Sequence, residues 1–280
     1  MAQRTWFITG ISSGFGREMT HQLLGRGDRV VGTVRKVDAV ADLQATHPDR
    51  LLVVRLDVTD LRAIKGVVDA AFASVGRIDV IVNNAGYGLF GAAEEVSDEQ
   101  IADQLNTNLV GPIYVARAAL PHLRAQGGGR IIQLSTYGGQ VAGAGGSLYH
   151  ASKWGIEGFM ESLMEEVASF NIGVTIVEPG GARTGFRFAS SKVGAELDAY
   201  KGTPVGAIHA FLKDGSRVAN GDPAKMARLM IDSVDHTPAP KRLVFGPDAY
   251  NALVKALMAR VADVQAQKDF AFSTDLPAGT

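Results

Sequence analysis

The sequence predicts an α/β fold, a single doubly wound domain whose central parallel sheet of about seven strands has helices on both faces. Short runs rich in β-branched and aromatic residues alternate along the chain with segments of helical periodicity, as in parallel sheets joined by helical crossovers. The chain has 280 residues, 46% of them hydrophobic, which is enough for one large core. It contains no internal repeat or obvious linker, so we expect residues 1–280 to form one domain.

The expected strands are short apolar runs. They are Trp6–Thr9, Arg29–Val34, Leu51–Leu56, Ile78–Val82, Arg130–Leu134, Gly173–Val177 and Leu243–Phe245. The expected helices lie between them and show apolar residues at helical spacing. They are Phe15–Arg26, Ala39–Gln44, Leu61–Val75, Asp98–Gln126, Leu148–Ser169 and Pro223–Ser233, with a further helix at about Asp248–Val264. Because strands and helices alternate, each crossover is expected to join two parallel strands.

Several helix boundaries carry local signals. Ser97 is followed three residues later by Gln100, which predicts a capping box. Asp222 precedes Pro223, whose missing N–H costs nothing at a helix start. Three glycines at 127–129 are expected to end the long helix before the next strand. The segment Gly180–Gly206 contains glycine and has no clear periodicity, so we expect a mobile loop there.

Composition excludes several classes of function. The 28 basic and 29 acidic residues give a net charge of −1, so no long-range field favours nucleic acid or an anionic membrane. The absence of cysteine excludes disulfides and thiolate catalysis. The six histidines show no metal-ligand spacing, so no metal is expected. No apolar run approaches the roughly 20 residues that cross a bilayer, and no signal segment precedes Trp6, so the expected location is cytoplasmic.

A glycine-rich turn follows the first strand. It reads Gly10-Ile11-Ser12-Ser13-Gly14-Phe15-Gly16, and a helix is expected directly after it. Glycines allow a tight turn and a close approach of the backbone to a pyrophosphate, which the N–H groups and dipole of the helix N-terminus then bind. The alternative is a tight strand-to-helix turn that binds no ligand.

Tyr149 and Lys153 are four residues apart, which places them on one face of a helix. Reduction of a carbonyl group needs a proton donor, and a nearby ammonium lowers the pKa of a phenol by favouring phenolate. Ser135 lies fourteen residues before Tyr149 at the carboxyl end of a strand, where such sheets bind ligands. Its hydroxyl is expected to hold the substrate oxygen toward Tyr149. The alternatives are structural: a packed aromatic ring, a surface charge and a strand-end hydroxyl.

Two further motifs complete a family pattern. Asn83-Asn84-Ala85-Gly86 follows the fourth strand, and Asn108 lies in the next helix. Together with the glycine turn, Ser135, Tyr149 and Lys153, they resemble the short-chain dehydrogenase/reductase family. The resemblance runs from about residue 5 to residue 184. It implies a Rossmann-type domain that transfers hydride between a nicotinamide and a carbonyl or secondary alcohol.

The resemblance also implies a role for each matching residue. The catalytic set would be Asn108, Ser135, Tyr149 and Lys153, with Tyr149 as the general acid/base and Asn108 holding a relay water. The structural alternative for Asn108 is a helix kink. The cofactor would contact the glycine turn, Asp57, Val58, Asn84, Ala85, Gly86, Tyr149, Lys153, Pro179, Gly180 and Thr184. Residues 1–135 would mainly bind the cofactor. Residues 136–280 would supply the catalytic helix, a substrate loop at about 180–206 and the C-terminal helices.

The end of the second strand bears on the choice of cofactor. An acidic residue there would bind the ribose hydroxyls, but this chain has Arg35 and Lys36. By resemblance, Arg35 occupies the position that selects NADP, where a guanidinium pairs with phosphate oxygens and Ser12 assists. We therefore expect NADP(H) to be preferred over NAD(H), which the site could also accept. The alternatives are a solvated basic pair at 35–36 and, for Asp57, a cap on the next helix.

The substrate site is expected to be apolar. The loop at 180–206 contains the apolar or aromatic residues Phe186, Phe188, Val193, Leu197 and Tyr200, which suggest a lid. Tyr87 and Phe90 are expected to face the same cleft. The expected substrate contacts are Ser135, Tyr137, Val141, Tyr149, Gly181 and Phe186. Alternatively, these aromatic residues pack on the C-terminal helix or across a subunit interface.

The sequence thus predicts an NADPH-dependent oxidoreductase acting on a small carbonyl or alcohol substrate that is apolar or aromatic. The alternative is a non-catalytic NADP-binding regulator or scaffold of the same fold, although such proteins usually lack a catalytic residue. The family also implies a homodimer or homotetramer. Fold alone does not name the substrate.

Overall fold

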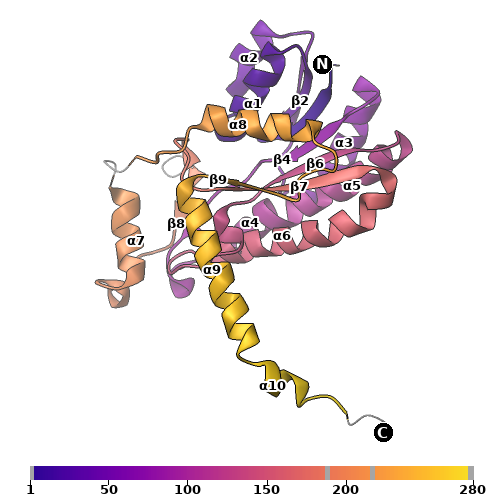
Figure 1. The fold of residues 1–280 in the computed structure, drawn as a ribbon. Coiled ribbons are helices and arrows are strands. Elements are labelled where there is room, and N and C mark those ends of the chain that lie inside the picture. The colour runs from indigo at the N-terminus through magenta and orange to yellow at the C-terminus, as the bar shows by residue number, and fades with distance from the viewer. Residues whose placement is uncertain (1–2, 187–189, 215–217, 277–280) are drawn as a thin grey trace.

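Seven parallel strands form the central sheet in the order β3-β2-β1-β4-β6-β7-β9 (Figure 1). The computed structural model describes residues 3–186, 190–214 and 218–276. The strands are β1 (Thr5–Thr9), β2 (Arg29–Val34), β3 (Leu51–Arg55), β4 (Val80–Asn83), β6 (Gly129–Leu134), β7 (Ile172–Pro179) and β9 (Arg242–Phe245). All seven expected strands are therefore present, and their ends differ from the prediction by at most two residues. The predicted single Rossmann-type domain is confirmed.

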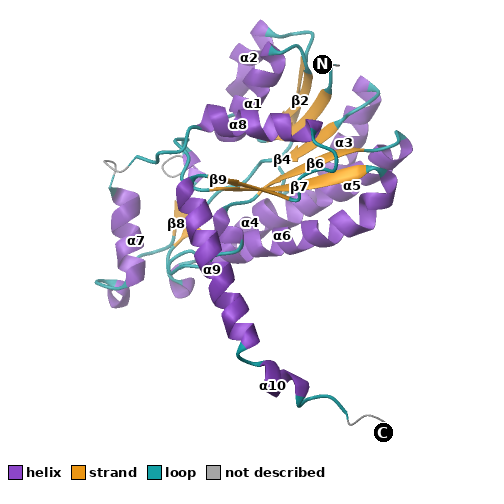
Figure 2. Cartoon of the chain, viewed as in Figure 1, coloured by secondary structure: helices purple, strands orange, loops and turns teal. Residues whose placement is uncertain are grey.

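Helices cover both faces of this sheet (Figure 2). They are α1 (Gly14–Gly25), α2 (Ala41–Thr46), α3 (Leu61–Val75), α4 (Asp98–Leu105), α5 (Gly111–Ala125), α6 (Ser147–Val167), α7 (Pro204–Lys213), α8 (Pro223–Asp232), α9 (Pro247–Gln265) and α10 (Lys268–Phe272). Single 3-10 turns occur at Val37–Val40, Ala93–Glu95, Tyr137–Gly139, Ala168–Phe170, Asp198–Tyr200 and Ser233–Asp235. Helices α1, α2 and α8 pack on one face, and α3, α5 and α6 pack on the other.

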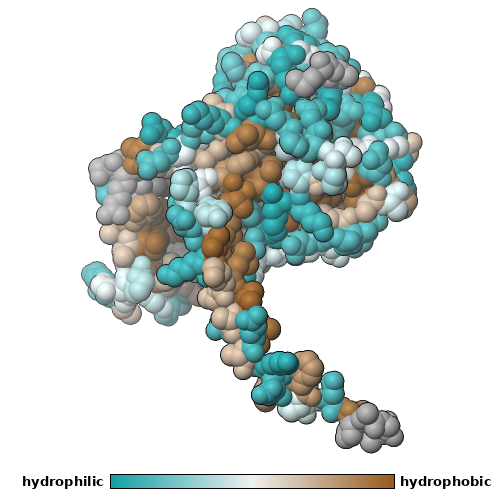
Figure 3. Space-filling model, in the orientation of Figure 1, coloured by the Kyte–Doolittle hydropathy of each residue, from teal (hydrophilic) through white to brown (hydrophobic). Residues whose placement is uncertain are grey.

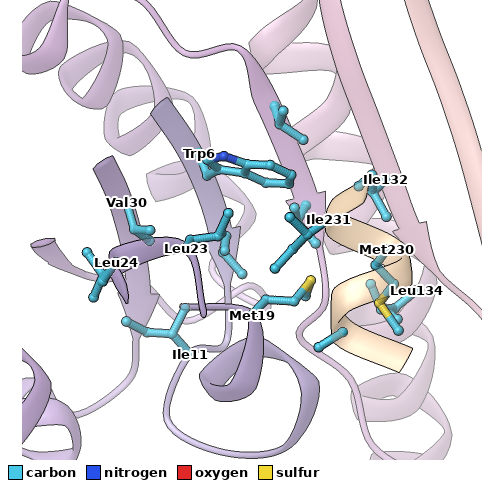
Figure 4. Close-up of a cluster of buried hydrophobic side chains, with 14 of the residues drawn as sticks. Trp6, Ile11, Met19, Leu23, Leu24, Val30, Ile132, Leu134, Met230 and Ile231 are labelled. Carbon is cyan, nitrogen blue, oxygen red and sulfur yellow. The ribbon is translucent and has the colours of Figure 1, made fainter. Parts of the chain in front are cut away.

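The alternation of side chains along β1 divides the core in two. Trp6 and Ile8 point to the face that α1 and α8 cover, where they lie in one buried cluster with Leu23 and Ile231 (Figure 4). Phe7 points to the opposite face and belongs to the cluster of α3, α5 and α6. Successive strand residues face opposite sides of a sheet, so a strand covered on both faces is apolar throughout.

Strand β1 lies where the chain order of the sheet reverses. It pairs with β2 on one side and with β4 on the other, and its last residue Thr9 is opposite Thr33. Sheets of this kind bind ligands at the carboxyl ends of the strands where the chain order reverses. The glycine turn begins at this point.

The long helix expected at Asp98–Gln126 is interrupted. Helix α4 ends at Leu105, a π-helical turn spans Asn106–Val110, and α5 continues from Gly111. Within the turn, the Asn108 side chain exchanges two hydrogen bonds with the backbone of Tyr87, at 2.8 and 3.1 Å. These bonds fix the irregular turn to the loop after β4. Such π-turns are frequent at functional sites.

The segment expected as a loop, Gly180–Gly206, is mostly irregular, but it contains structure that the sequence analysis missed. Strand β8 (Lys192–Val193) pairs with β5 (Leu89–Phe90). Helix α7 follows, and the hydroxyl of Thr203 caps it. Phe188, one of the expected lid residues, lies outside the described residues. Further along the chain, α9 extends away from the sheet and exposes apolar residues along its length (Figure 3).

Candidate active site

The glycine turn is shaped for close approach of a ligand. Gly10 and Gly14 have positive φ values of 74° and 56°, which glycine adopts without strain. A Cβ on Gly16 would lie 2.4 Å from both Asn84 Nδ2 and Gly10 O, so only glycine fits there. Ser13, the N-cap of α1, makes no side-chain capping bond. The first N–H groups of α1 are therefore available to an anionic group, and this arrangement fits a dinucleotide pyrophosphate.

Asn84 ties the glycine turn to the end of β4. Its side-chain nitrogen donates to Thr9 O at 2.8 Å and to Gly10 O at 2.9 Å. The hydroxyl of Thr9 accepts from the backbone N–H groups of Asn84 and Ala85, both at 3.0 Å. The expected cofactor-binding residues of β1 and β4 therefore lie together at one edge of the sheet.

Arg35 and Lys36 are exposed just beyond β2. The glycine turn reaches this strand through Gly10 N and Ile11 N, which donate to Thr33 O at 3.0 and 3.2 Å. Arg35 and Lys36 thus lie two and three residues beyond Thr33, whose carbonyl accepts these hydrogen bonds from the turn. Asp57 is exposed after β3 and accepts hydrogen bonds from the backbone and hydroxyl of Thr59, at 3.0 and 2.8 Å, beside buried Val58. Asp57 therefore has a local structural role, while Asp60 caps α3.

Tyr149 is buried on α6, and the side chain of Thr136 lies beside it. Burial raises the pKa of Tyr149 above its ordinary value, because removal from water disfavours phenolate, whereas the side chain of Thr136 acts to lower this pKa. The lowered pKa that the sequence predicted is thus not found in this structure. Thr136 is also buried, and its Oγ1 lies 3.3 Å from the carbonyl oxygen of Pro179.

Ser135 has a different partner from the one expected. Its hydroxyl donates to the carboxylate of Glu157 on α6. Ser135 and Thr136 follow β6 directly, and consecutive residues of an extended chain point to opposite sides. The hydroxyl that contacts Tyr149 is therefore that of Thr136. The sequence carried a signal for this, since two adjacent hydroxyl residues end the strand and only one can face the tyrosine.

Lys153 is buried close to the expected relay residue. Its ammonium donates to Leu134 O at 2.9 Å, and burial lowers its pKa to about 8. A Cβ on Gly86 would lie 3.8 Å from Lys153 Nζ and 3.1 Å from Asn108 Oδ1, so Gly86 brings both side chains close to the backbone after β4. The side chains of Lys153 and Asn108 are thus close to each other and to Gly86, one of the residues expected to bind the cofactor.

Aromatic rings surround Tyr149. The ring centroids of Phe90 and Phe186 lie 5.8 and 6.0 Å from that of Tyr149. His150, with a centroid at 6.0 Å, bonds through Nδ1 to Gly138 O at 2.8 Å and orders the loop before α6. Phe90 lies in β5, where it is opposite Val193 of β8, and Phe186 follows β7. The walls near the phenol are therefore apolar.

The remaining expected substrate and cofactor residues are spread around this centre. Tyr137 and Val141 are partly buried beyond β6, and burial raises the pKa of Tyr137. Gly181 is exposed, and its N–H donates to Asp248 Oδ2 at 2.7 Å. A Cβ on Gly180 would lie 2.2 Å from Asp248 Oδ1. The hydroxyl of Thr184 accepts from Phe186 N at 3.3 Å, which supports the aromatic wall.

Residues 4–192 match the family model of the short chain dehydrogenases. The chain belongs to the short-chain dehydrogenase/reductase family. Within this family, oxidoreductase BOA17 of Botryotinia fuckeliana is 38% identical over 254 residues, which cover 90% of this chain and 92% of that protein. This short-chain dehydrogenase/reductase is therefore an NAD(P)-dependent oxidoreductase, as the sequence predicted.

Solved structures of short-chain dehydrogenases share its fold. A short-chain dehydrogenase from Streptomyces avermitilis is 37% identical, with a TM-score of 0.90 over 98% of this chain and 99% of that one. A Burkholderia phymatum member in complex with NAD has a TM-score of 0.80 at 21% identity, over 95% of each chain. A metagenomic member in complex with NADP has a TM-score of 0.69 at 24% identity, over 86% of this chain and 96% of that one. The last two support the fold alone.

The patterns of metal sites and of membrane-spanning helices are both absent from residues 3–186, 190–214 and 218–276. No group of three or more His, Asp or Glu side chains there is arranged to bind a metal ion. In the same residues, no helix is both long and apolar enough to cross a membrane.

Proposed function

We propose that this oxidoreductase interconverts ketones or aldehydes and alcohols with NADP(H), and that Tyr149 is its general acid/base. The observation that carries this proposal is the buried group of Thr136, Tyr149 and Lys153, which lies beside the glycine turn at the carboxyl ends of the strands. In ketone reduction, the bound nicotinamide supplies hydride to the carbonyl carbon, and the oxygen takes a proton from the protein.

Each residue of this group has a distinct task. Thr136 hydrogen-bonds the substrate oxygen and holds it at the Tyr149 phenol. Tyr149 gives up its proton to that oxygen, and the positive charge of Lys153 stabilises the phenolate that forms. Because burial disfavours the phenolate, the charge of Lys153 is required. The side chains of Asn108 and Lys153 both lie close to Gly86. Asn108 holds the water that, through Lys153, returns a proton to Tyr149.

The preference for NADP(H) rests on Arg35. Its guanidinium is exposed at the end of β2, where no acidic residue is present to bind ribose hydroxyls or repel a phosphate. Solved complexes of family members contain either cofactor: the metagenomic member contains NADP, and the Burkholderia phymatum member contains NAD. The choice in this protein therefore depends on its own residues at 35 and 36.

The apolar walls support an apolar or aromatic substrate. Phe90 and Phe186 flank Tyr149, and Thr136 and Tyr149 provide the polar groups that orient one oxygen. A relative from Bacteroides thetaiotaomicron that is 39% identical over 64% of each chain is named a 3-ketodihydrosphingosine reductase. Sugars and charged keto acids are then poor substrates.

The test is steady-state oxidation of NADPH by the purified protein with a panel of aromatic ketones, long-chain ketones, sugars and charged keto acids. Turnover should be highest with the apolar ketones. A protein that binds NADPH tightly but reduces no member of the panel, even at high enzyme concentration, would instead fit the alternative of a regulator or scaffold.

We also propose a homodimer or homotetramer. The exposed apolar residues of α9, among them Met258 and Val264, support a subunit interface there. Sedimentation velocity decides this point. Exchange of these two residues for glutamate should yield monomers if α9 forms the interface, and a parent protein that sediments as a monomer would end the proposal.

A further inference from the structure

A ladder of ionisable residues runs along one face of α6. Tyr149, Lys153, Glu157 and Glu161 are spaced four residues apart, so each lies one turn beyond the previous one. Tyr149 and Lys153 belong to the proposed reaction centre. Glu157 is just as deeply buried, with 3% of its surface exposed, but the reaction assigns it no task. Burying a carboxylate costs free energy unless the charge is paired and hydrogen-bonded.

Glu157 belongs to a compact cluster at the end of the sheet. Arg242 on β9 lies 2.5 Å from Glu157 Oε2, and its other terminal nitrogen lies 2.8 Å from Glu161. It also pairs with the fully buried Glu178 on β7, which accepts a hydrogen bond from Gln140. One guanidinium thus serves two buried carboxylates. When both are ionised, one negative charge remains in the interior.

The cluster is packed closely against the active-site strand. The Ser135 hydroxyl donates to Glu157 Oε1. A Cβ on Gly139 would lie 1.8 Å from Glu157 Oε1 and 2.7 Å from Ser135 Oγ, so the glycine leaves room for the carboxylate. Ser135, the residue before Thr136, therefore helps to hold the Glu157 carboxylate in place.

The charges of Glu157 and Lys153 depend on each other. Burial raises the pKa of Glu157 to about 7; the charge of Glu178 adds to this rise, whereas the hydrogen bonds from Ser135 and Arg242 oppose it. Burial lowers the pKa of Lys153 to about 8, and the negative charge of Glu157 raises it. Other titratable groups nearby are Tyr149 on α6, Tyr137 in the turn after β6, and Asp248 on α9, which interacts with Tyr137.

We propose that Glu157 is a positioning residue that keeps Lys153 protonated in the interior and, through Lys153, makes proton transfer from Tyr149 feasible. The negative charge that remains after Arg242 has paired with Glu178 is balanced by the ammonium one turn earlier on α6. This inference rests on the proposed role of Tyr149 and Lys153, and extends it to a residue that touches neither substrate nor cofactor.

The direction in which Glu157→Gln shifts the pH profile follows from the pKa values of Glu157 and Lys153. Above about pH 7 Glu157 is ionised and holds the proton on Lys153. Glutamine removes that charge, so the pKa of Lys153 falls and the lysine becomes neutral at a lower pH. The alkaline limb of the kcat profile for ketone reduction should move down by about one pH unit, the size expected for a close opposite charge. Below about pH 6 the parent Glu157 is already neutral, so the two profiles should converge.

Two variants control this measurement. Glu161→Gln removes a carboxylate on the same face of α6 that also contacts Arg242, but its side chain is 60% exposed to water. It should leave the alkaline limb unmoved. Glu157→Asp retains the charge and should restore the limb toward the parent position. A uniform loss of kcat at every pH, equal in Glu157→Gln and Glu157→Asp, would show a merely structural role and overturn the proposal.

A second measurement needs no substrate. Carboxyl-carbon NMR of the glutamate-labelled protein should show one resonance that titrates near pH 7 and disappears in Glu157→Gln. If that resonance titrates in the ordinary glutamate range, the proposal fails whatever the kinetics show. Failure of the proposed function appears differently: Tyr149→Phe would then retain turnover, or no carbonyl compound would be reduced.

Discussion

His209 Nε2 on α7 lies 2.8 Å from Oε2 of Glu95, and both side chains are buried although 114 positions separate them in the chain. The same carboxylate accepts from Leu197 N at 2.9 Å and from Ala92 N at 2.7 Å. Glu95 thus joins the segment 190–214 to the segment that follows β5. Since Phe90 in β5 also flanks Tyr149, this junction links segment 190–214 to the aromatic wall beside Tyr149.

Glu95→Ala should loosen the segment 190–214. It leaves His209 and Leu197 N without their buried acceptor, which is costly for groups removed from water. We expect faster proteolytic cleavage within 190–214 and a raised KM for apolar ketones, with kcat less affected. Asp198→Ala is the control, because that carboxylate lies in the same segment but is exposed and pairs with the exposed Lys201. Equal cleavage of the parent and the Glu95 variant would show that this carboxylate does not hold the segment.

Tyr149→Phe should abolish turnover and leave NADPH binding nearly intact, because the ring remains and only the acidic proton is lost. The loss from removing a positioned proton donor is at least about a hundredfold. Steady-state kinetics and cofactor fluorescence titration measure the two effects. Turnover within a few-fold of the parent would remove Tyr149 from the mechanism.

Thr136→Ala should reduce kcat by about a hundredfold, the cost of losing a donor aimed at the reacting oxygen. Thr136→Ser retains the hydroxyl and should keep most of the activity. Ser135→Ala should have a smaller effect at neutral pH, since its hydroxyl bonds Glu157. Kinetics of the three variants with one ketone decide between the adjacent hydroxyls. If Ser135→Ala proves the more damaging, Ser135 holds the substrate oxygen, as the sequence predicted.

Arg35→Asp should shift the preference from NADPH toward NADH. The new carboxylate repels a 2′-phosphate and accepts ribose hydroxyls. The measurement is the ratio of kcat/KM with the two cofactors. Lys225→Asp, the same type of charge change at an exposed position on α8, should not alter this ratio. A parent protein that already prefers NADH would refute the assignment of Arg35.

The regular part of the fold was predictable because its signals are local. Each central strand is a short apolar run, and capping residues mark helix starts at Ser97 and Asp222, where the predicted side-chain bonds are present. The sequence offered a helix kink at Asn108 only as an alternative to the relay role, and it did not predict the π-helical turn. This turn depends on hydrogen bonds to Tyr87, which the chain brings near only after folding.

The sequence by itself determined the fold class, the family and the residue types of the proposed active site, since the glycine turn and the Tyr149–Lys153 spacing are short-range patterns. Only the tertiary structure decided which hydroxyl reaches Tyr149 and which partner Ser135 has. It also decided that Arg242 pairs with Glu157 and that Glu95 meets His209. The physical reason is that periodicity specifies which face of an element is buried. Contacts between distant elements depend on strand order, register and the packing of side chains in three dimensions.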